Sequence, residues 1–62
     1  MNKIKAFRKE QSIKLSNLSQ MTGLSTGYLS HLERGEKNNP SYNTMKKIAI
    51  ALGKNIGDVF DN

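Results

Sequence analysis

The sequence predicts an all-α fold, a compact domain of five short helices, and three observations support this prediction. Apolar residues recur at helical spacing, most clearly in the series i, i+3, i+4, i+7 formed by Met45, Ile48, Ala49 and Leu52. Glycine or a polar capping residue separates the segments from one another. No segment shows the strict alternation of apolar and polar residues that is typical of a half-buried strand.

The first helix is expected over roughly residues 3–10, where Ile4 and Phe7 fall on one face. Asn2 precedes this segment, and asparagine is one of the residues that cap a helix N-terminus. The first helix should therefore begin immediately after Asn2 and turn its apolar face toward the core.

The centre of the chain, residues 15–34, is its most informative part, because it has the pattern of a helix-turn-helix unit. Its two helices are expected over 15–21 and 25–34. Gly23 stands where the first of them ends and the chain turns, and a left-handed backbone there suits glycine. Ser25 offers a side-chain oxygen to cap the second helix. Such a unit places its second helix in the major groove of DNA.

The remaining helices follow a loop. Gly35 is expected to end helix 25–34, and a polar loop over 36–40 leads to Ser41, which can cap a fourth helix. Gly53 ends that helix, and a last short turn is expected over 56–60. The predicted core is drawn from all these segments and comprises Ile4, Phe7, Leu18, Leu24, Leu29, Leu32, Met45, Ile48, Leu52 and Phe60.

Length and composition limit the function. The 62 residues are expected to form one domain, residues 1–62, with ten Lys and Arg against five Asp and Glu and a net charge of +5. This charge suits a polyanionic partner, although small proteins also carry such a balance for solubility. The chain has no cysteine and one histidine, so we expect no metal and no cofactor. No apolar run predicts a membrane span or signal peptide, and a cytoplasmic location is expected.

With these elements placed, the chain resembles the phage-repressor/Cro class of helix-turn-helix proteins, the Xre-type family. The resemblance covers residues 4–60. It is carried by the runs Thr22-Gly23-Leu24-Ser25, Tyr28-Leu29-Ser30, Leu32-Glu33-Arg34-Gly35, Asn39-Pro40-Ser41 and Ile48-Ala49-Ile50-Ala51-Leu52-Gly53. It implies a five-helix fold in which the third helix reads base edges, while the second helix and the loop before the fourth contact phosphates. Family members commonly bind palindromic operators as dimers and act as repressors.

The resemblance also implies a structural salt bridge between Arg8 and Glu33, which makes Arg8 a brace and not a DNA contact. The chain departs from the family at the start of the second helix. Thr or Ser followed by Gln is usual there, whereas Lys14 and Leu15 stand at those positions. Lys14 or Ser16 is therefore expected to supply a phosphate contact in place of the missing glutamine.

These considerations predict two sets of DNA contacts. Base contacts are assigned to the exposed face of the third helix: Thr26, Gly27, Tyr28, Ser30 and His31. Phosphate contacts are assigned to Lys14, Ser16, Arg34, Lys37, Asn38, Asn39 and Ser41. Three of the base contacts have a second interpretation: Tyr28 as a packing residue, His31 as an ordinary exposed side chain, and Gly27 as a tolerated glycine near a helix end.

We predict that the chain binds double-stranded DNA in a sequence-specific way and regulates transcription, most often as a repressor. We expect it to act as a weak or DNA-induced homodimer. Ile56 and Val59 are candidate dimer contacts, with closure of the monomer's own core as the equal alternative. A protein-interaction or antitoxin-like module with the same fold is the second hypothesis, and it predicts an apolar patch on the third helix. The scattered carboxylates and single histidine give no catalytic pairing, so an enzyme is not expected, and no small-molecule ligand is suggested.

Overall fold

The computed structural model describes residues 2–36 and 40–60, which contain five helices and no strand. The helices are α1 (Ile4–Glu10), α2 (Leu15–Thr22), α3 (Thr26–Glu33), α4 (Tyr42–Leu52) and α5 (Ile56–Phe60). The predicted all-α fold is therefore confirmed. The ends of the helices lie within about one residue of the predicted positions, which is the usual uncertainty of such boundaries.

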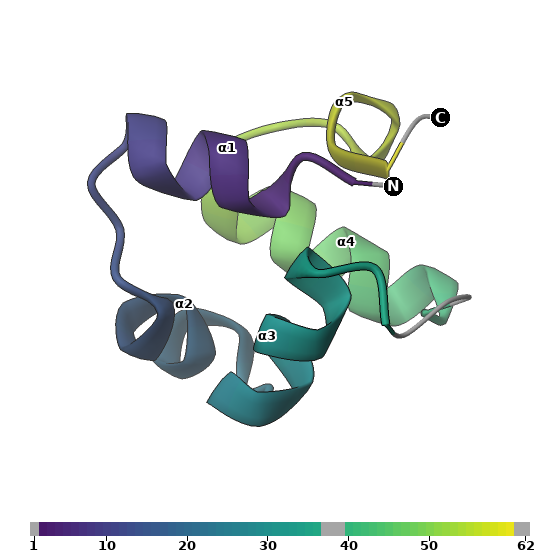
Figure 1. The fold of residues 1–62 in the computed structure, drawn as a ribbon. Helices are drawn as coiled ribbons and strands as arrows, with labels where there is room; N and C mark the ends of the chain where they lie inside the picture. Colours follow the sequence, from purple (N-terminus) through teal and green to yellow (C-terminus); the bar gives the residue numbers. More distant parts are fainter. Residues whose placement is uncertain (1, 37–39, 61–62) are drawn as a thin grey trace.

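The longest of the described helices, α4, is central to the fold, since it packs against α1, α2 and α5 (Figure 1). Helices α2 and α3 pack against each other on one side of α4, while α1 and α5 pack together on the other. The backbone N–H of Lys3 donates to the carbonyl of Val59 at 2.7 Å, which ties the start of α1 to α5. This arrangement leaves one long side of α3 without a covering helix.

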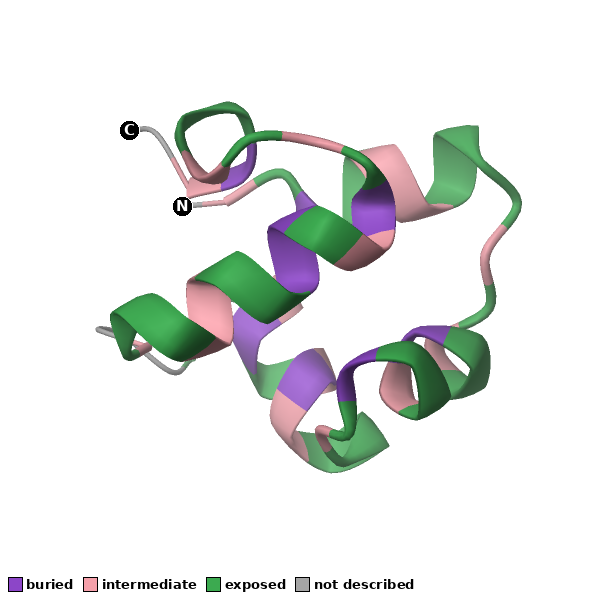
Figure 2. Ribbon diagram, turned by 180° about the vertical axis from the view of Figure 1, so that it is seen from behind, coloured by how far each residue is buried: buried purple, intermediate pink, exposed green. Residues whose placement is uncertain are grey.

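The core consists of apolar side chains from all five helices, and Figure 2 shows the buried segments turned toward one another. Its members are Ile4, Leu18, Leu29, Leu32, Ile48, Ala49, Leu52 and Val59. Three predicted members, Phe7, Leu24 and Phe60, are only partly buried and pack at its edge, and Met45 is also only partly buried. In α5 the inward position belongs to Val59, so Val59 fills the place that the sequence assigned to Phe60.

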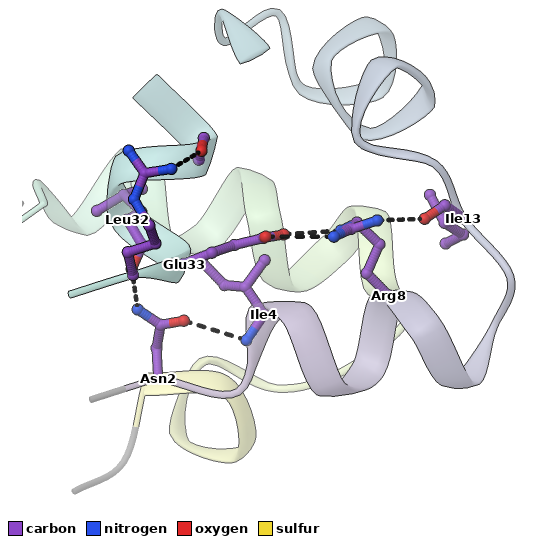
Figure 3. Close-up of polar contacts among 8 residues, drawn as sticks. Asn2, Ile4, Arg8, Ile13, Leu32 and Glu33 are labelled. Carbon is purple, nitrogen blue, oxygen red and sulfur yellow. Dashed lines mark hydrogen bonds and ion pairs between the residues drawn. The ribbon is translucent and has the colours of Figure 1, made fainter. Parts of the chain in front are cut away.

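Polar caps fix the helix starts. Ser25 Oγ accepts the N–H of Tyr28, and Ser41 Oγ accepts the N–H of Thr44, each at 3.1 Å, as predicted for N-cap serines. Asn2 lies one residue before the N-cap position of α1, yet its Oδ1 still accepts the N–H of Ile4 at 3.2 Å. The same amide donates to the carbonyl of Leu32 at 2.8 Å and so links α1 to α3 (Figure 3).

Candidate nucleic-acid interface

The turn between α2 and α3 has the geometry that the sequence predicts. Gly23 has φ 76° and ψ 9°, in the left-handed region, and its N–H donates to the carbonyl of Ser19 at 2.8 Å. A Cβ built on Gly23 would meet no heavy atom within 4 Å. Glycine is therefore favoured here by its backbone conformation and not by lack of space.

Two side chains that the sequence did not single out for this role hold the turn in place. The hydroxyl of Thr22 is buried; it donates to the carbonyl of Leu18 at 2.8 Å and accepts the N–H of Leu24 at 3.2 Å. Ser19 Oγ donates to the carbonyl of Leu24 at 2.5 Å. These bonds satisfy polar groups beside the core, so the direction in which α3 leaves the turn is fixed by hydrogen bonds as well as by packing.

Helix α3 has one buried face and one exposed face. Leu29 and Leu32 are at most 1% exposed and anchor the helix in the core. On the other side, Thr26, Gly27 and His31 are exposed. Of the remaining predicted base contacts, Tyr28 and Ser30 are half-buried, and Tyr28 packs against the core cluster. The exposed face of α3 is therefore polar and made of small or medium-sized side chains.

An ion pair attaches the end of α3 to α1. Arg8 Nε lies 2.7 Å from Glu33 Oε2 and Arg8 Nη2 lies 3.2 Å from Glu33 Oε1, with only 13% and 7% of the two side chains exposed. Arg8 Nη1 also donates to the carbonyl of Ile13 at 3.0 Å (Figure 3). The guanidinium points inward from α1 toward α3 and the loop before α2, as a brace would.

A second cluster lies at the C-terminal end of α3, and its acidic member, Glu36, was not predicted. Arg34 forms a forked pair with Glu36, with Nε 3.0 Å from Oε2 and Nη2 3.2 Å from Oε1. Arg34 Nη1 donates to Ser30 Oγ at 2.8 Å, and His31 Nε2 lies 3.8 Å from Glu36 Oε1. The hydrogen bond from Arg34 lowers the pKa of Glu36, and the hydrogen bond and charge of Glu36 raise the pKa of Arg34. The signal in the sequence was a carboxylate two residues after an exposed arginine.

Three of the predicted phosphate contacts lie at the starts of helices, while Arg34 lies at the C-terminal end of α3. Lys14 and Ser16 are exposed at the N-terminus of α2, and Ser41 is exposed at the N-terminus of α4. The first turns of α2, α3 and α4 contain no acidic residue, so the partial positive charge of these helix ends is not neutralised there. Lys37, Asn38 and Asn39 lie outside the described residues.

The predicted dimer contact is wrong in one of its two residues. Val59 has no exposed surface, because α5 turns it into the core between α1 and α4, and it is not available to a partner. Ile56 is half-buried and packs against the same core. Val59 therefore closes the monomer's own core, as in the alternative interpretation, whereas Ile56 stays a candidate dimer contact.

Among residues 2–36 and 40–60, no group of three or more His, Asp or Glu side chains is placed to hold a metal ion. Within the same residues, no helix is both long enough and apolar enough to span a bilayer.

Comparison with known proteins finds relatives that include a transcriptional regulator and a repressor. Over 59 residues the chain is 34% identical to the HTH-type transcriptional regulator SinR of Bacillus subtilis, covering 95% of this chain and 53% of SinR. Over 51 residues it is 41% identical to the immunity repressor protein of Bacillus phage phi105, covering 82% of this chain and 35% of the repressor. The chain thus spans about half, or less, of the length of these relatives.

Two solved structures have the same fold. The structure of the SinR–SinI protein complex superposes with a TM-score of 0.89 at 33% identity, over 97% of this chain and 58% of that one. A crystal structure of SinR, described as the master regulator for biofilm formation, in complex with DNA superposes with a TM-score of 0.82 at 35% identity, over 87% and 86%. The helix-turn-helix family model matches residues 4–59, nearly the whole chain. The chain therefore belongs to the helix-turn-helix family.

Proposed function

We propose that this chain is a sequence-specific DNA-binding transcriptional regulator that inserts α3 into the major groove. The observation that carries this proposal is the exposed polar face of α3, held outward by a glycine turn on one side and the Arg8–Glu33 pair on the other. A helix in this position meets base edges with its first turn. That turn is occupied here by Thr26 and Gly27, which are exposed and small.

The proposed base contacts use different chemistry. Thr26 can offer its hydroxyl to a base or its methyl group to thymine, and His31 can donate to a guanine acceptor. Ser30 is half-buried and its Oγ accepts from Arg34, so its remaining hydrogen-bonding capacity points to a weaker role. Tyr28 packs against the core cluster, which favours its interpretation as a packing residue whose hydroxyl reaches the DNA backbone.

The proposed phosphate contacts flank this face. Lys14 contributes charge, and the free N–H groups at the starts of α2 and α4 contribute hydrogen bonds, together with Ser16 and Ser41. We include Lys37, Asn38 and Asn39 as further phosphate contacts on the basis of the sequence. The DNA complex of SinR supports this mode of binding, because that protein has the same fold at 35% identity.

Repression and a palindromic operator belong to the same proposal. Repression is supported by the similarity to a phage immunity repressor. A palindromic operator requires two copies of the recognition helix related by a two-fold axis, and we propose that DNA binding itself brings the two copies together.

Selection of bound sequences from a random duplex DNA pool tests this function. At about 0.15 M salt, where exposed charges are screened over roughly 8 Å, nonspecific binding is weakened and specific binding is expected to remain. We expect an enriched inverted repeat whose half-sites lie about one helical turn, or a multiple of it, apart. A folded sample that enriches no sequence refutes a sequence-specific regulator, and an enriched single half-site refutes the dimeric arrangement.

A protein-interaction module is the second candidate. One neighbour of this fold is a complex of SinR with the SinI protein, which favours a protein partner for this chain as well. Three large apolar side chains, Met21, Tyr42 and Ile50, are more than half exposed, but they belong to α2 and α4. The interaction hypothesis placed an apolar patch on α3, where the exposed residues are Thr26, Gly27 and His31, so DNA is the better supported partner.

A further inference from the structure

The cluster at the end of α3 has a property that the DNA-binding proposal does not use: its only arginine is already occupied by a carboxylate. Three N–H groups of Arg34 are engaged, two by Glu36 and one by Ser30. The carboxylate of Glu36 also lies 3.8 Å from the Nε2 atom of His31. Glu36 therefore stands directly against two side chains of the predicted DNA-binding face.

The Arg, Asp and Glu side chains of residues 26–36, which comprise α3 and the turn after it, are all paired with opposite charges. Glu33 is paired with Arg8 at the buried edge of the helix. Arg34 and Glu36, each with 54% of the side chain exposed, cancel each other. Although the chain has a net charge of +5, each Arg, Asp or Glu side chain of residues 26–36 is thus paired with a side chain of opposite charge.

We propose that Glu36 acts as an internal competitor of DNA phosphate for Arg34 and thereby limits the affinity of the interface for DNA of any sequence. This inference rests on the proposed function. A carboxylate offers arginine the same forked acceptor geometry as a phosphate. A phosphate can bind Arg34 only by displacing Glu36 or by approaching a neutral pair, and in both cases the carboxylate repels it. Base contacts at Thr26 are unaffected, so competition at Arg34 raises the share of the binding free energy that comes from the bases.

The substitution E36Q tests the proposal, because it keeps the shape of the side chain and removes its charge. The carboxylate charge that E36Q removes is exposed, so water screens its repulsion of a phosphate, and the expected change in affinity is modest, about fivefold. We therefore expect E36Q to bind a short mixed-sequence duplex about fivefold more tightly than the wild-type chain. We also expect the plot of log affinity against log salt to become steeper by about 0.9, because one more phosphate is neutralised.

The matched control is E10Q, which removes one negative charge at the exposed end of α1 and leaves Arg34 paired. Its affinity is expected to change by less than that of E36Q, and its salt slope should equal that of the wild type. The double variant R34A/E36Q completes the comparison. If Glu36 acts through Arg34, E36Q should change the salt slope in the wild-type background and leave it unchanged in the R34A background.

The two proposals fail in different ways. If the wild-type chain binds duplex DNA but E36Q binds it equally or more weakly, the competitor role is wrong and the DNA-binding function stands. Weaker binding by E36Q would mean that Glu36 orients Arg34 for DNA and does not compete for it. If the wild-type chain, folded by circular dichroism, does not bind duplex DNA at any salt concentration, the DNA-binding function itself is refuted.

Discussion

Removal of the Arg8 side chain is expected to destabilise the fold severely while leaving DNA affinity per folded molecule unchanged. The substitution R8A deletes two hydrogen bonds to Glu33 and one to the carbonyl of Ile13. Because only 7% of the Glu33 side chain is exposed in the folded state, its carboxylate would be left poorly hydrated and without an ionic partner. Breaking a buried pair in this way costs about 3–5 kcal/mol.

This loss is large relative to the whole stability of the chain. A chain of 62 residues is expected to have a free energy of unfolding of about 3–9 kcal/mol. R8A should therefore retain at most about 6 kcal/mol of this free energy, and its midpoint in urea titrations followed by far-UV circular dichroism should fall well below that of the wild-type chain. K9A is the matched control, because Lys9 is an exposed cation next to Arg8 on α1. Its unfolding free energy should change by about 0.5 kcal/mol or less.

A double variant distinguishes a stranded charge from lost packing. R8M/E33L replaces both charged side chains with apolar ones of similar size, and such replacements of buried pairs are often neutral or stabilising. It should therefore be clearly more stable than R8A. If R8A melts like the wild-type chain but binds DNA more weakly, Arg8 contacts DNA and its role as a brace is wrong.

Three further outcomes are expected. T26A and H31A should keep the wild-type melting temperature, because both side chains are exposed. Each should relax the base preference found in a repeated DNA selection. An unchanged base preference would mean that the residues contacting DNA are misassigned. G23A should lower the unfolding free energy by about 1–2 kcal/mol, the cost of a left-handed backbone for an L-residue, as a shift in the urea midpoint at constant slope. Finally, if four to six phosphates are neutralised per subunit, log affinity should fall with log salt concentration with a slope of about −4 to −5. An affinity that does not change with salt concentration would contradict an interface that binds phosphates.

The helices were predictable because local signals and tertiary packing agree in this chain. Glycine after a helix and serine before one are short-range signals, and Gly23, Ser25 and Ser41 all act as expected. The apolar period of α4 is long enough to fix both its type and its buried face. The Arg8–Glu33 pair was predicted only through the family resemblance, since nothing in the spacing of two residues 25 apart indicates that they meet.

The wrong assignment of Phe60 and Val59 and the failure to predict the role of Glu36 have a common physical origin. Val59 and Phe60 are neighbours in a short helix, and which of them points inward depends on the angle at which α5 meets α1 and α4. That angle is set by long-range contacts such as the bond between the Lys3 N–H and the Val59 carbonyl. Glu36 was missed for a similar reason: its reach back to Arg34 and His31 depends on the turn after α3, which residue types alone do not specify.

The two faces of α3 allow stability and recognition to be separated at one residue, Gly27. It is the second residue of α3, it is exposed, and a Cβ built there meets no heavy atom within 4 Å. Alanine is a better helix former than glycine by up to about 0.8–1 kcal/mol, so G27A should raise the melting temperature by about 2–8 °C. The new methyl group would nevertheless project from the first turn of the helix, the part that meets base edges.

If glycine is needed there so that the backbone can approach the DNA, G27A will be more stable and bind DNA more weakly. The control is G57A in α5, where a Cβ likewise meets nothing within 4 Å and the glycine is also exposed. G57A should stabilise the chain and leave DNA affinity unchanged. Should G27A gain stability and keep full affinity, as G57A does, then glycine at this position is merely tolerated and close approach of the backbone plays no part in binding.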